Sequence, residues 1–357
     1  DYINYPTVSA LWSALDDMCS PEDGCDALTI PHNTNMGDGI SFEILESSQT
    51  ELSQRAQYER LIEITQEKGT SECLPQYGTD GTGDCDFELY LTRKSRPTEP
   101  DNYSRKEWQD MRSSYARSLV GRGLAFTGNA SPLRLGFIGS TDTHSATPGY
   151  VDEHVWSGSV FAGPGLDGAM LRKNWSAGGL VGVWAKENTR EAIFDALHRR
   201  ETYATSGPRI GLRFGVDDEE RSSCDTNEWR PRVNMGQVSE MKAAPTFAVQ
   251  VQADTAPIAT VEMIKITRGH SEINEEVIQI WMETDASMTR CVSWRDTEFD
   301  PTIPTLWYPR VRQQATPRWS AVQCAKAGRC DEFPEVNVTI QERAWGSPIW
   351  HFPYRPH

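Results

Sequence analysis

Apolar and amphipathic stretches alternate along the chain up to about residue 210. Short apolar runs predict buried strands at residues 27–30, 61–64, 135–138 and 178–184. Helical spacing predicts helices within residues 1–27 and over residues 50–60, 104–127 and 189–200. Because alternating strands and helices are typical of an α/β fold, we predict one domain of this class over residues 1–209.

The pattern changes after residue 210. Residues 246–253 and 261–269 alternate apolar and polar side chains, and residues 277–284 and 336–345 are further strand candidates. Short alternating strands joined by turn-forming residues indicate antiparallel sheets. We therefore predict a β-rich, sandwich-like domain over residues 210–357, packed on the first domain.

The strongest candidate for chemistry is the polar segment STDTHS, which follows the apolar run at residues 135–138. Asp142 and His144 are two residues apart, so an extended backbone points both side chains to the same side. A carboxylate and an imidazole at a strand end are common ligands of divalent metals. The alternative is that Asp142 caps the following turn and that His144 lies on the surface.

Four further polar residues are candidates for a site. Asn33 and Asn35 follow the apolar run at residues 27–30 and can orient a substrate, although Asn is also a common turn residue. Lys68 can receive an anionic substrate group, with a solvated loop lysine as the alternative. Glu63 interrupts the next apolar run, where a carboxylate is costly unless it meets a cation or hydrogen-bond donors.

The sequence GSTDTH at residues 139–144 resembles the C-terminal metal motif of the PHP (polymerase and histidinol phosphatase) superfamily. Four other stretches resemble, in the same order along the chain, the DUF3604 branch of that superfamily. They are IPHNTN at residues 30–35, RLIEITQEKGTSEC at residues 60–73, the long stretch at residues 174–210 and QERAWGSPIW at residues 341–350. The resemblance runs from about residue 28 to the end of the chain.

The resemblance implies an amidohydrolase-like, metal-dependent hydrolase on a distorted PHP-type β/α barrel, followed by the β-sandwich-like domain. It implies that His32, Asp142 and His144 bind metal, with Glu63 as a further ligand or an acceptor beside the site. Asp142, His144 and Glu63 are the implied catalytic residues, and Asn33, Asn35 and Lys68 the substrate-binding ones. The position of Glu67 is often His in family relatives, and this departure puts metal binding there in doubt.

The implied cofactor is two or three divalent transition-metal ions (Zn, Mn or Fe) that activate a water molecule. A small-molecule phosphoester is the favoured substrate, because the superfamily is rich in phosphatases. A second hypothesis is a non-catalytic binding or assembly protein that keeps the barrel and contacts partners or glycans through its β-rich domain.

Members of the superfamily begin with a His-x-His strand and an Asp-His pair, and this sequence has neither. We therefore expect the chain to be the C-terminal part of a longer protein, with an incomplete barrel. The remaining metal ligands would come from an N-terminal fragment of the same protein, and a homo-oligomer is the alternative partner.

Charge and cysteine content narrow the class of protein. A net charge of −16 argues against a nucleic-acid partner, and no apolar run reaches membrane-spanning length. Six of the eight cysteines form close pairs, which favours disulfides and a periplasmic or extracellular location over zinc binding or reduced thiols. The expected pairs are Cys19 with Cys25, Cys73 with Cys85 (opening an insertion over residues 73–106), Cys324 with Cys330, and the remaining Cys224 with Cys291.

Overall fold

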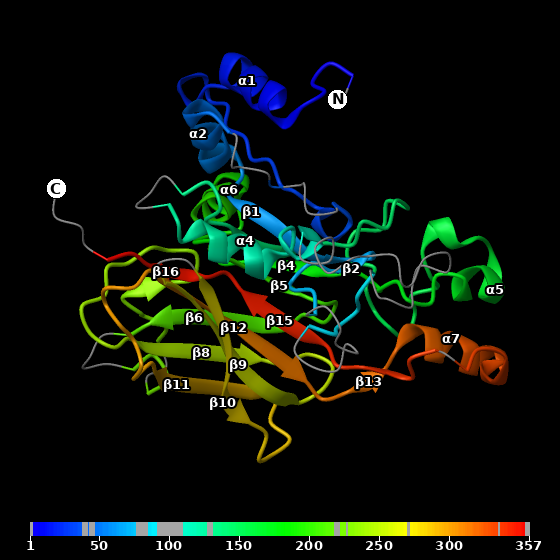
Figure 1. The fold of residues 1–357 in the computed structure, drawn as a ribbon. Helices are drawn as coiled ribbons and strands as arrows, with labels where there is room; N and C mark the ends of the chain where they lie inside the picture. Colours follow the sequence, from blue (N-terminus) through cyan, green and yellow to red (C-terminus); the bar gives the residue numbers. More distant parts are fainter. Residues whose placement is uncertain are drawn as a thin grey trace.

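The computed structural model describes residues 3–37, 42, 47–75, 85–90, 110–126, 131–217, 222–225, 228–269, 272–334 and 336–353. The N-terminal helices lie at the top of Figure 1 and the large sheets lie below them. Among the described residues, no helix has the length and apolar character that crossing a membrane requires.

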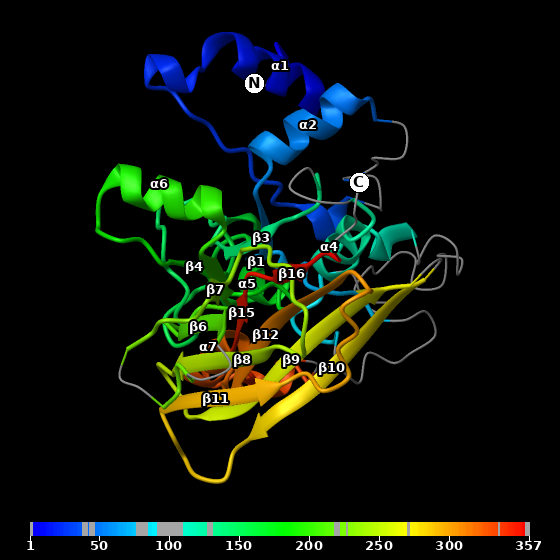
Figure 2. The same ribbon diagram turned by 90° about the vertical axis from the view of Figure 1, so that its left-hand side faces the viewer.

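Two N-terminal helices, α1 (Val8–Met18) and α2 (Gln49–Tyr58), pack against each other at one end of the molecule (Figure 2). The Thr7 side chain caps α1, and Ser48 and Glu51 form a capping box at the start of α2. Tyr58 donates a hydrogen bond of 2.6 Å to Asp16 and so ties α2 to α1. Both predicted helices are confirmed, although α2 buries three of its polar side chains rather than lying exposed.

A small three-stranded sheet follows, in the order β2-β1-β3. Its strands are β1 (Leu61–Gln66), β2 (Gly69–Thr70) and β3 (Gly136–Gly139). β1 and β3 run parallel, which confirms the strands predicted at residues 61–64 and 135–138. The strand predicted at residues 27–30 does not form. Next to this segment, one backbone hydrogen bond connects it to β1, from Glu63 N–H to the Pro31 carbonyl. Pro31 has no N–H with which to continue a strand ladder.

Two larger antiparallel sheets follow in the rest of the chain. The seven-stranded sheet has the order β10-β9-β12-β15-β5-β4, with β16 also paired to β12, and the four-stranded sheet has the order β11-β8-β6-β7. The first comprises β4 (Leu180–Val183), β5 (Thr202–Thr205), β9 (Ile258–Arg268), β10 (Ile273–Met282), β12 (Thr305–Gln313), β15 (Arg343–Gly346) and β16 (Ile349–His351). The second comprises β6 (Gly211–Val216), β7 (Val233–Asn234), β8 (Thr246–Gln252) and β11 (Thr289–Arg295), and β13 (Thr316–Pro317) pairs with β14 (Thr339–Ile340).

The seven-stranded sheet is covered on both faces. Val261 and Met263 of β9 belong to a core shared with the four-stranded sheet, as in a β-sandwich. Ile264 and Ile266 belong to a second core with residues of β1, β3 and the helix α4 (Ala116–Gly123). The predicted sandwich-like arrangement therefore extends into a third layer, which carries β1 and β3.

No closed barrel forms among the described residues, so the expected PHP-type barrel is not seen there. β4 lies within the segment predicted as the last barrel strand, but it pairs antiparallel with β5, and β5 pairs with β15. The seven-stranded sheet thus takes strands from both sides of residue 209, and the domain boundary predicted there stays a prediction. Pairing partners so far apart in the sequence leave no local pattern that could reveal them.

Helix predictions were met in part. α6 (Arg190–Arg199) is capped by Thr189 as expected. The predicted helix at residues 104–127 is interrupted at residues 113–115, and its proposed N-terminal cap lies outside the described residues. α4 begins at Ala116 because the carbonyl groups of Ser71 and Glu72 accept its first N–H groups, at 2.8 and 2.9 Å.

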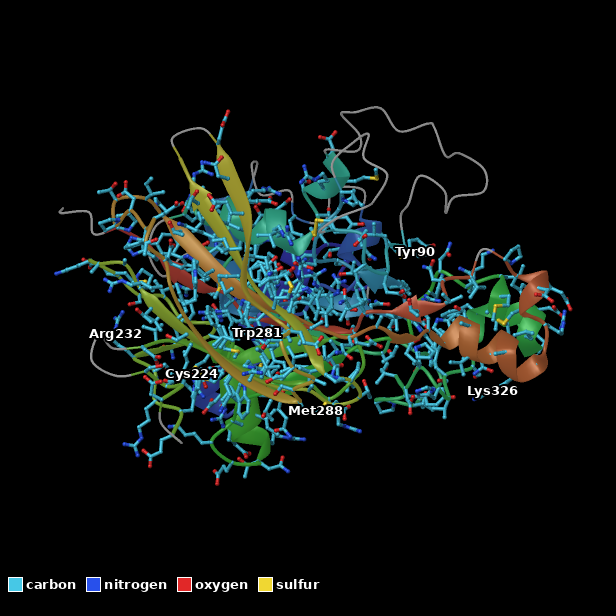
Figure 3. The ribbon with its side chains drawn as sticks, turned by 90° about the horizontal axis from the view of Figure 1, so that it is seen from below. Tyr90, Cys224, Arg232, Trp281, Met288 and Lys326 are labelled. Atoms are coloured by element: carbon cyan, nitrogen blue, oxygen red, sulfur yellow. A yellow bond between two sulfur atoms is a disulfide. The ribbon has the colours of Figure 1, made fainter. Side chains whose placement is uncertain are left out.

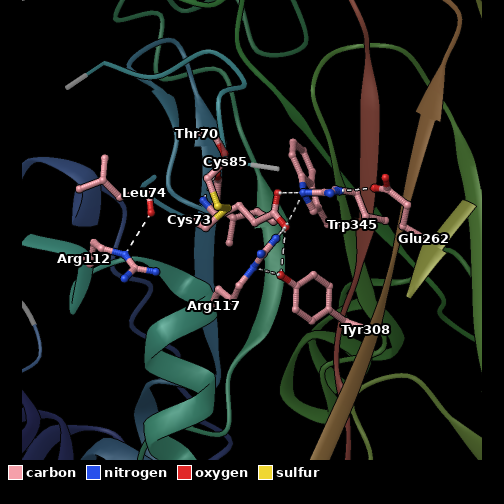
Figure 4. The surroundings of a disulfide bond; sticks show 12 residues. Thr70, Cys73, Leu74, Cys85, Arg112, Arg117, Glu262, Tyr308 and Trp345 are labelled. Atoms are coloured by element: carbon pink, nitrogen blue, oxygen red, sulfur yellow. Dashed lines mark hydrogen bonds and ion pairs between the residues drawn. A yellow bond between two sulfur atoms is a disulfide. The ribbon is translucent and has the colours of Figure 1, made fainter. Parts of the chain in front are cut away.

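All four predicted disulfides are present, and with them no cysteine is free. Cys73–Cys85 closes the start of the expected insertion beside β2, in the surroundings that Figure 4 shows. Figure 3 labels Cys224, which bonds to Cys291 of β11, and Lys326 on α7 (Trp319–Ala327), the helix that carries Cys324. Four disulfides are typical of a protein of an oxidising compartment, which agrees with the predicted export.

Candidate metal site

The loop after β3 has an unusual backbone. Asp142, His144 and Ala146 all have positive φ angles, of 52°, 54° and 54°, although none of them is glycine. The extended backbone expected here is therefore wrong, and the left-handed residues turn the chain sharply instead. The two side chains still come together, with His144 Nδ1 2.6 Å from the Asp142 carbonyl oxygen and 3.6 Å from Asp142 Oδ1. Backbone strain of this kind is concentrated at functional sites.

Glu67 joins this pair from the turn between β1 and β2. Its N–H donates to the Thr141 carbonyl and its carbonyl accepts from Ser176 N–H, so the backbone is fixed on both sides. Its carboxylate is fully buried, and Oε1 lies 3.7 Å from His144 Nδ1. Neither Oε atom makes a hydrogen bond within the described part of the chain. One ligand atom each from Glu67, Asp142 and His144 lie within 4.8 Å of one another.

Lys68 lies on the other side of Asp142. Its ammonium group is 2.5 Å from Asp142 Oδ2 and 3.0 Å from Asn33 Oδ1. The Gln66 side-chain amide donates to Asn33 Oδ1 at 3.1 Å and also to the His32 carbonyl. Lys68 and Asn33, both predicted substrate-binding residues, therefore lie together beside Asp142.

The other predicted site residues have different surroundings. The Asn35 amide donates to the Lys68 carbonyl at 2.8 Å, so this side chain supports the turn between β1 and β2. Glu63 is buried in β1, where Ser140 donates to its Oε2 and its Oε1 has no partner among the described residues. His32 is exposed and is not a member of the cluster of three ligand residues. Its role as a ligand stays a prediction.

A model of the family described as "Protein of unknown function (DUF3604)" matches residues 1–291 and 283–353. The chain belongs to the DUF3604 family. Over 234 residues it is also 26% identical to an uncharacterized protein of Chlamydia pneumoniae, a match that covers 64% of this chain. The chain spans only 29% of the length of that relative. No solved structure matches the chain.

The donor set in this DUF3604 chain fits a divalent transition metal. Carboxylate oxygens and an imidazole nitrogen suit Zn, Mn or Fe. A buried carboxylate without hydrogen bonds, as at Glu67, is costly unless a cation compensates it. Metal binding at Glu67 was in doubt because relatives often have histidine there. A carboxylate is also a metal ligand, however, and the turn after β1 places Glu67 beside His144.

Electrostatics divide the carboxylates of this DUF3604 site into two groups. Burial raises the pKa of Glu63 and of Glu67 to about 7, against lowering contributions from nearby hydroxyl groups and from Lys68. Burial acts in the same direction on Asp142, but the hydrogen bond and charge of Lys68, with a contribution from His144, bring its pKa below the ordinary value. Asp142 is thus held ionised, while the other two carboxylates are close to the pH at which they exchange protons.

Proposed function

We propose that this chain carries part of the active site of a divalent-metal-dependent hydrolase, with a phosphoester as the substrate class. The observation that carries the proposal is the cluster of Glu67, Asp142 and His144, in which a fully buried carboxylate has no hydrogen-bond partner among the described residues. A divalent metal bound there would lower the pKa of a water molecule and neutralise charge on a phosphoryl oxygen.

The chain's own residues have separable roles in this proposal. Glu67, Asp142 and His144 hold the cation, and segments of the whole protein beyond these three residues supply the remaining ligands. The Lys68 ammonium group and the Asn33 amide receive the anionic substrate beside Asp142. Glu63, whose Oε1 is unpartnered among the described residues, accepts a proton near neutral pH.

Metal binding by the purified chain tests this proposal directly. We expect chelator-treated protein to bind Zn²⁺ or Mn²⁺ in a calorimetric titration, and Glu67→Gln to weaken binding at least about tenfold. Glu187→Gln, at an exposed position, is the matched control and should bind as the wild type does. The whole protein, loaded with the same metal, should hydrolyse a p-nitrophenyl phosphate ester. Equal metal affinity in both variants, or metal binding by the whole protein without hydrolysis of mono- or diesters, would refute the proposal.

A second candidate function is ligand binding by the β-rich part of the chain. A cavity of about 450 Å³ lies on the polar side of β6, β8 and β11, where Trp184, Arg213, Gln250 and Arg290 line it. An aromatic ring, guanidinium groups and amides together suit a glycan or an acidic ligand. Arg213→Ala should abolish such binding and leave metal affinity unchanged, whereas Glu67→Gln should do the reverse. The disulfides favour the periplasm or the extracellular space as the place where either function operates.

A further inference from the structure

A second group of carboxylates, two of them buried, includes none of the three cluster residues. It lines a cavity of about 160 Å³ between the loop that continues from His144, the turn after β5 and the residue before β15. Asp152, Glu153, Asp254 and Glu342 contribute four acidic side chains to the lining, and Arg209 is a basic one. The walls therefore carry a clear excess of negative charge.

Glu153 and Glu342 are the decisive residues. Their exposed fractions are 7% and 2%. One oxygen of each accepts a single bond, from Trp319 N–H in Glu153 and from the Ser206 hydroxyl in Glu342. The other oxygen, Oε1 in both, makes no hydrogen bond within the described residues. Two carboxylates that are nine-tenths buried, each with one unpartnered oxygen among the described residues, thus line the same cavity.

The charges of Arg318 and Arg343 act on Glu153 and Glu342 respectively, but among the described residues neither arginine donates a hydrogen bond to the unpartnered oxygens. The Arg318 side chain bonds to Glu88 at 2.9 and 2.7 Å, to the carbonyls of Lys173 and Trp175 and to Ser320. Arg209 is exposed, and its backbone N–H bonds to Asp254. Burial raises the pKa of Glu153 to about 8, with repulsion from Glu88 added, and burial and the charge of Glu153 raise that of Glu342. Burial and the neighbouring acidic groups thus outweigh the nearby arginines at both carboxylates.

Gly207 keeps space open at this point. A side-chain Cβ there would lie 3.1 Å from the Val151 carbonyl oxygen and 3.9 Å from Glu342 Oε1. Its φ of 145° is also one that residues with side chains rarely adopt. The glycine thus leaves a carbonyl oxygen and a carboxylate oxygen facing the same gap.

We propose that this cavity is a second cation site, for a hard divalent ion of the Ca²⁺ class, with Glu153 and Glu342 as its charged ligands. Carboxylate and carbonyl oxygens are the donors that Ca²⁺ prefers, and it accepts irregular geometry. The ion would join the loop that carries Asp142 and His144 to β5 and β15. Its role is to hold that loop in place, and it does not depend on the hydrolase proposal.

The test uses the full chain after removal of metals by a chelator. Ca²⁺ should raise the thermal midpoint of the wild type and of Glu67→Gln equally, because Glu67 lies outside this cavity. Glu342→Gln and Glu153→Gln should each lower Ca²⁺ affinity at least about tenfold. In chelator, Glu342→Gln should be as stable as the wild type or more so, because it removes a buried carboxyl group whose Oε1 has no hydrogen-bond partner among the described residues. This outcome shows that the variant folds.

A measurement on the wild type alone complements the variants. Trp319, whose backbone N–H donates to Glu153, and the adjacent Trp156 should sensitise the emission of Tb³⁺ bound in the cavity, and excess Ca²⁺ should displace it. The proposal is overturned if Tb³⁺ emission is absent, if Ca²⁺ stabilises the Glu342→Gln variant as much as the wild type, or if only Zn²⁺ binds at these residues.

Discussion

Glu72 offers the sharpest test of how the layer that carries the candidate metal site is attached to the central sheet. Its carboxylate is 2% exposed and accepts bonds from Arg117 (2.7 Å), Arg310 (3.2 Å), Tyr308 (3.0 Å) and Trp345 (2.6 Å). Figure 4 shows Arg117, Tyr308 and Trp345 pointing toward one another from α4, β12 and β15. Glu72 itself follows β2, so this one carboxylate connects α4 and the small sheet to two strands of the seven-stranded sheet.

Glu72→Gln keeps the shape of the side chain and removes its charge. All of the contacting groups are donors, so the new amide N–H₂ must face at least one N–H or O–H group. Breaking a buried ion pair by neutralising one partner costs about 3–5 kcal/mol. At about 2 °C per kcal/mol, the thermal midpoint should fall by roughly 6–10 °C. The control is Glu275→Gln, at an exposed position of β10, which should leave the midpoint unchanged.

The same carboxylate predicts a pH dependence. Burial would raise the pKa of Glu72, but the charges of Arg310 and Arg117 outweigh it and bring the pKa well below the ordinary value of 4.5. A lowered native-state pKa contributes stability that is fully present above the ordinary pKa and is lost as the pH falls below it. Wild-type stability should therefore decrease below about pH 4.5, and more steeply than that of Glu72→Gln. A variant within about 1 kcal/mol of the wild type in urea unfolding at pH 7 would refute this account of the attachment.

Two further predictions concern the disulfides and the strand that leads to the site. Replacing both Cys73 and Cys85 by Ser should lower the free energy of unfolding by about 3 kcal/mol. Replacing Cys19 and Cys25 should cost less, because that disulfide closes a shorter loop (sequence separation 6 against 12). Urea unfolding of the two double variants checks this order, and the reverse order would contradict the prediction. Gly139→Ala should destabilise the protein by roughly 1–3 kcal/mol and weaken metal binding, since its Cβ would lie 2.8 Å from the Leu180 carbonyl oxygen. Gly211→Ala, whose Cβ meets nothing closer than 3.4 Å, is the control in urea unfolding and in metal titration. Equal effects of the two substitutions would count against close packing at Gly139.

Local patterns in the sequence predicted the features that depend on neighbouring residues. The apolar run before Ser140 located β3 and, after it, Asp142 and His144. Loop closure between nearby cysteines predicted the disulfides. The strand expected before His32 failed for a local reason as well, because Pro31 cannot donate a ladder hydrogen bond.

Features that depend on distant partners were not predictable in this way. The sequence near β4 and β5 does not indicate that β5 pairs with β15, which lies about 140 residues later in the chain. Glu153 and Glu342 likewise meet only in the folded chain. The case of Glu67 is different, because its spacing from β1 was visible, but comparison with the histidine common in relatives led away from it. Histidine and glutamate are both good metal ligands, so a glutamate in place of histidine is weak evidence against metal binding at position 67.

Lys68 bears most closely on whether the three-residue cluster can hold a cation, since its ammonium group already contacts Asp142. The contact is made to Oδ2, whereas Oδ1 is the oxygen 3.6 Å from His144 Nδ1. Glu67 also approaches His144 on that side, with both of its oxygens unbonded among the described residues. The two carboxylate oxygens of Asp142 therefore serve different neighbours, and a cation held by Glu67 and His144 does not require Lys68 to leave. Lys68 instead keeps Asp142 ionised. In the proposed site it would add a second positive charge beside the bound cation, which would favour an anionic substrate over a neutral one.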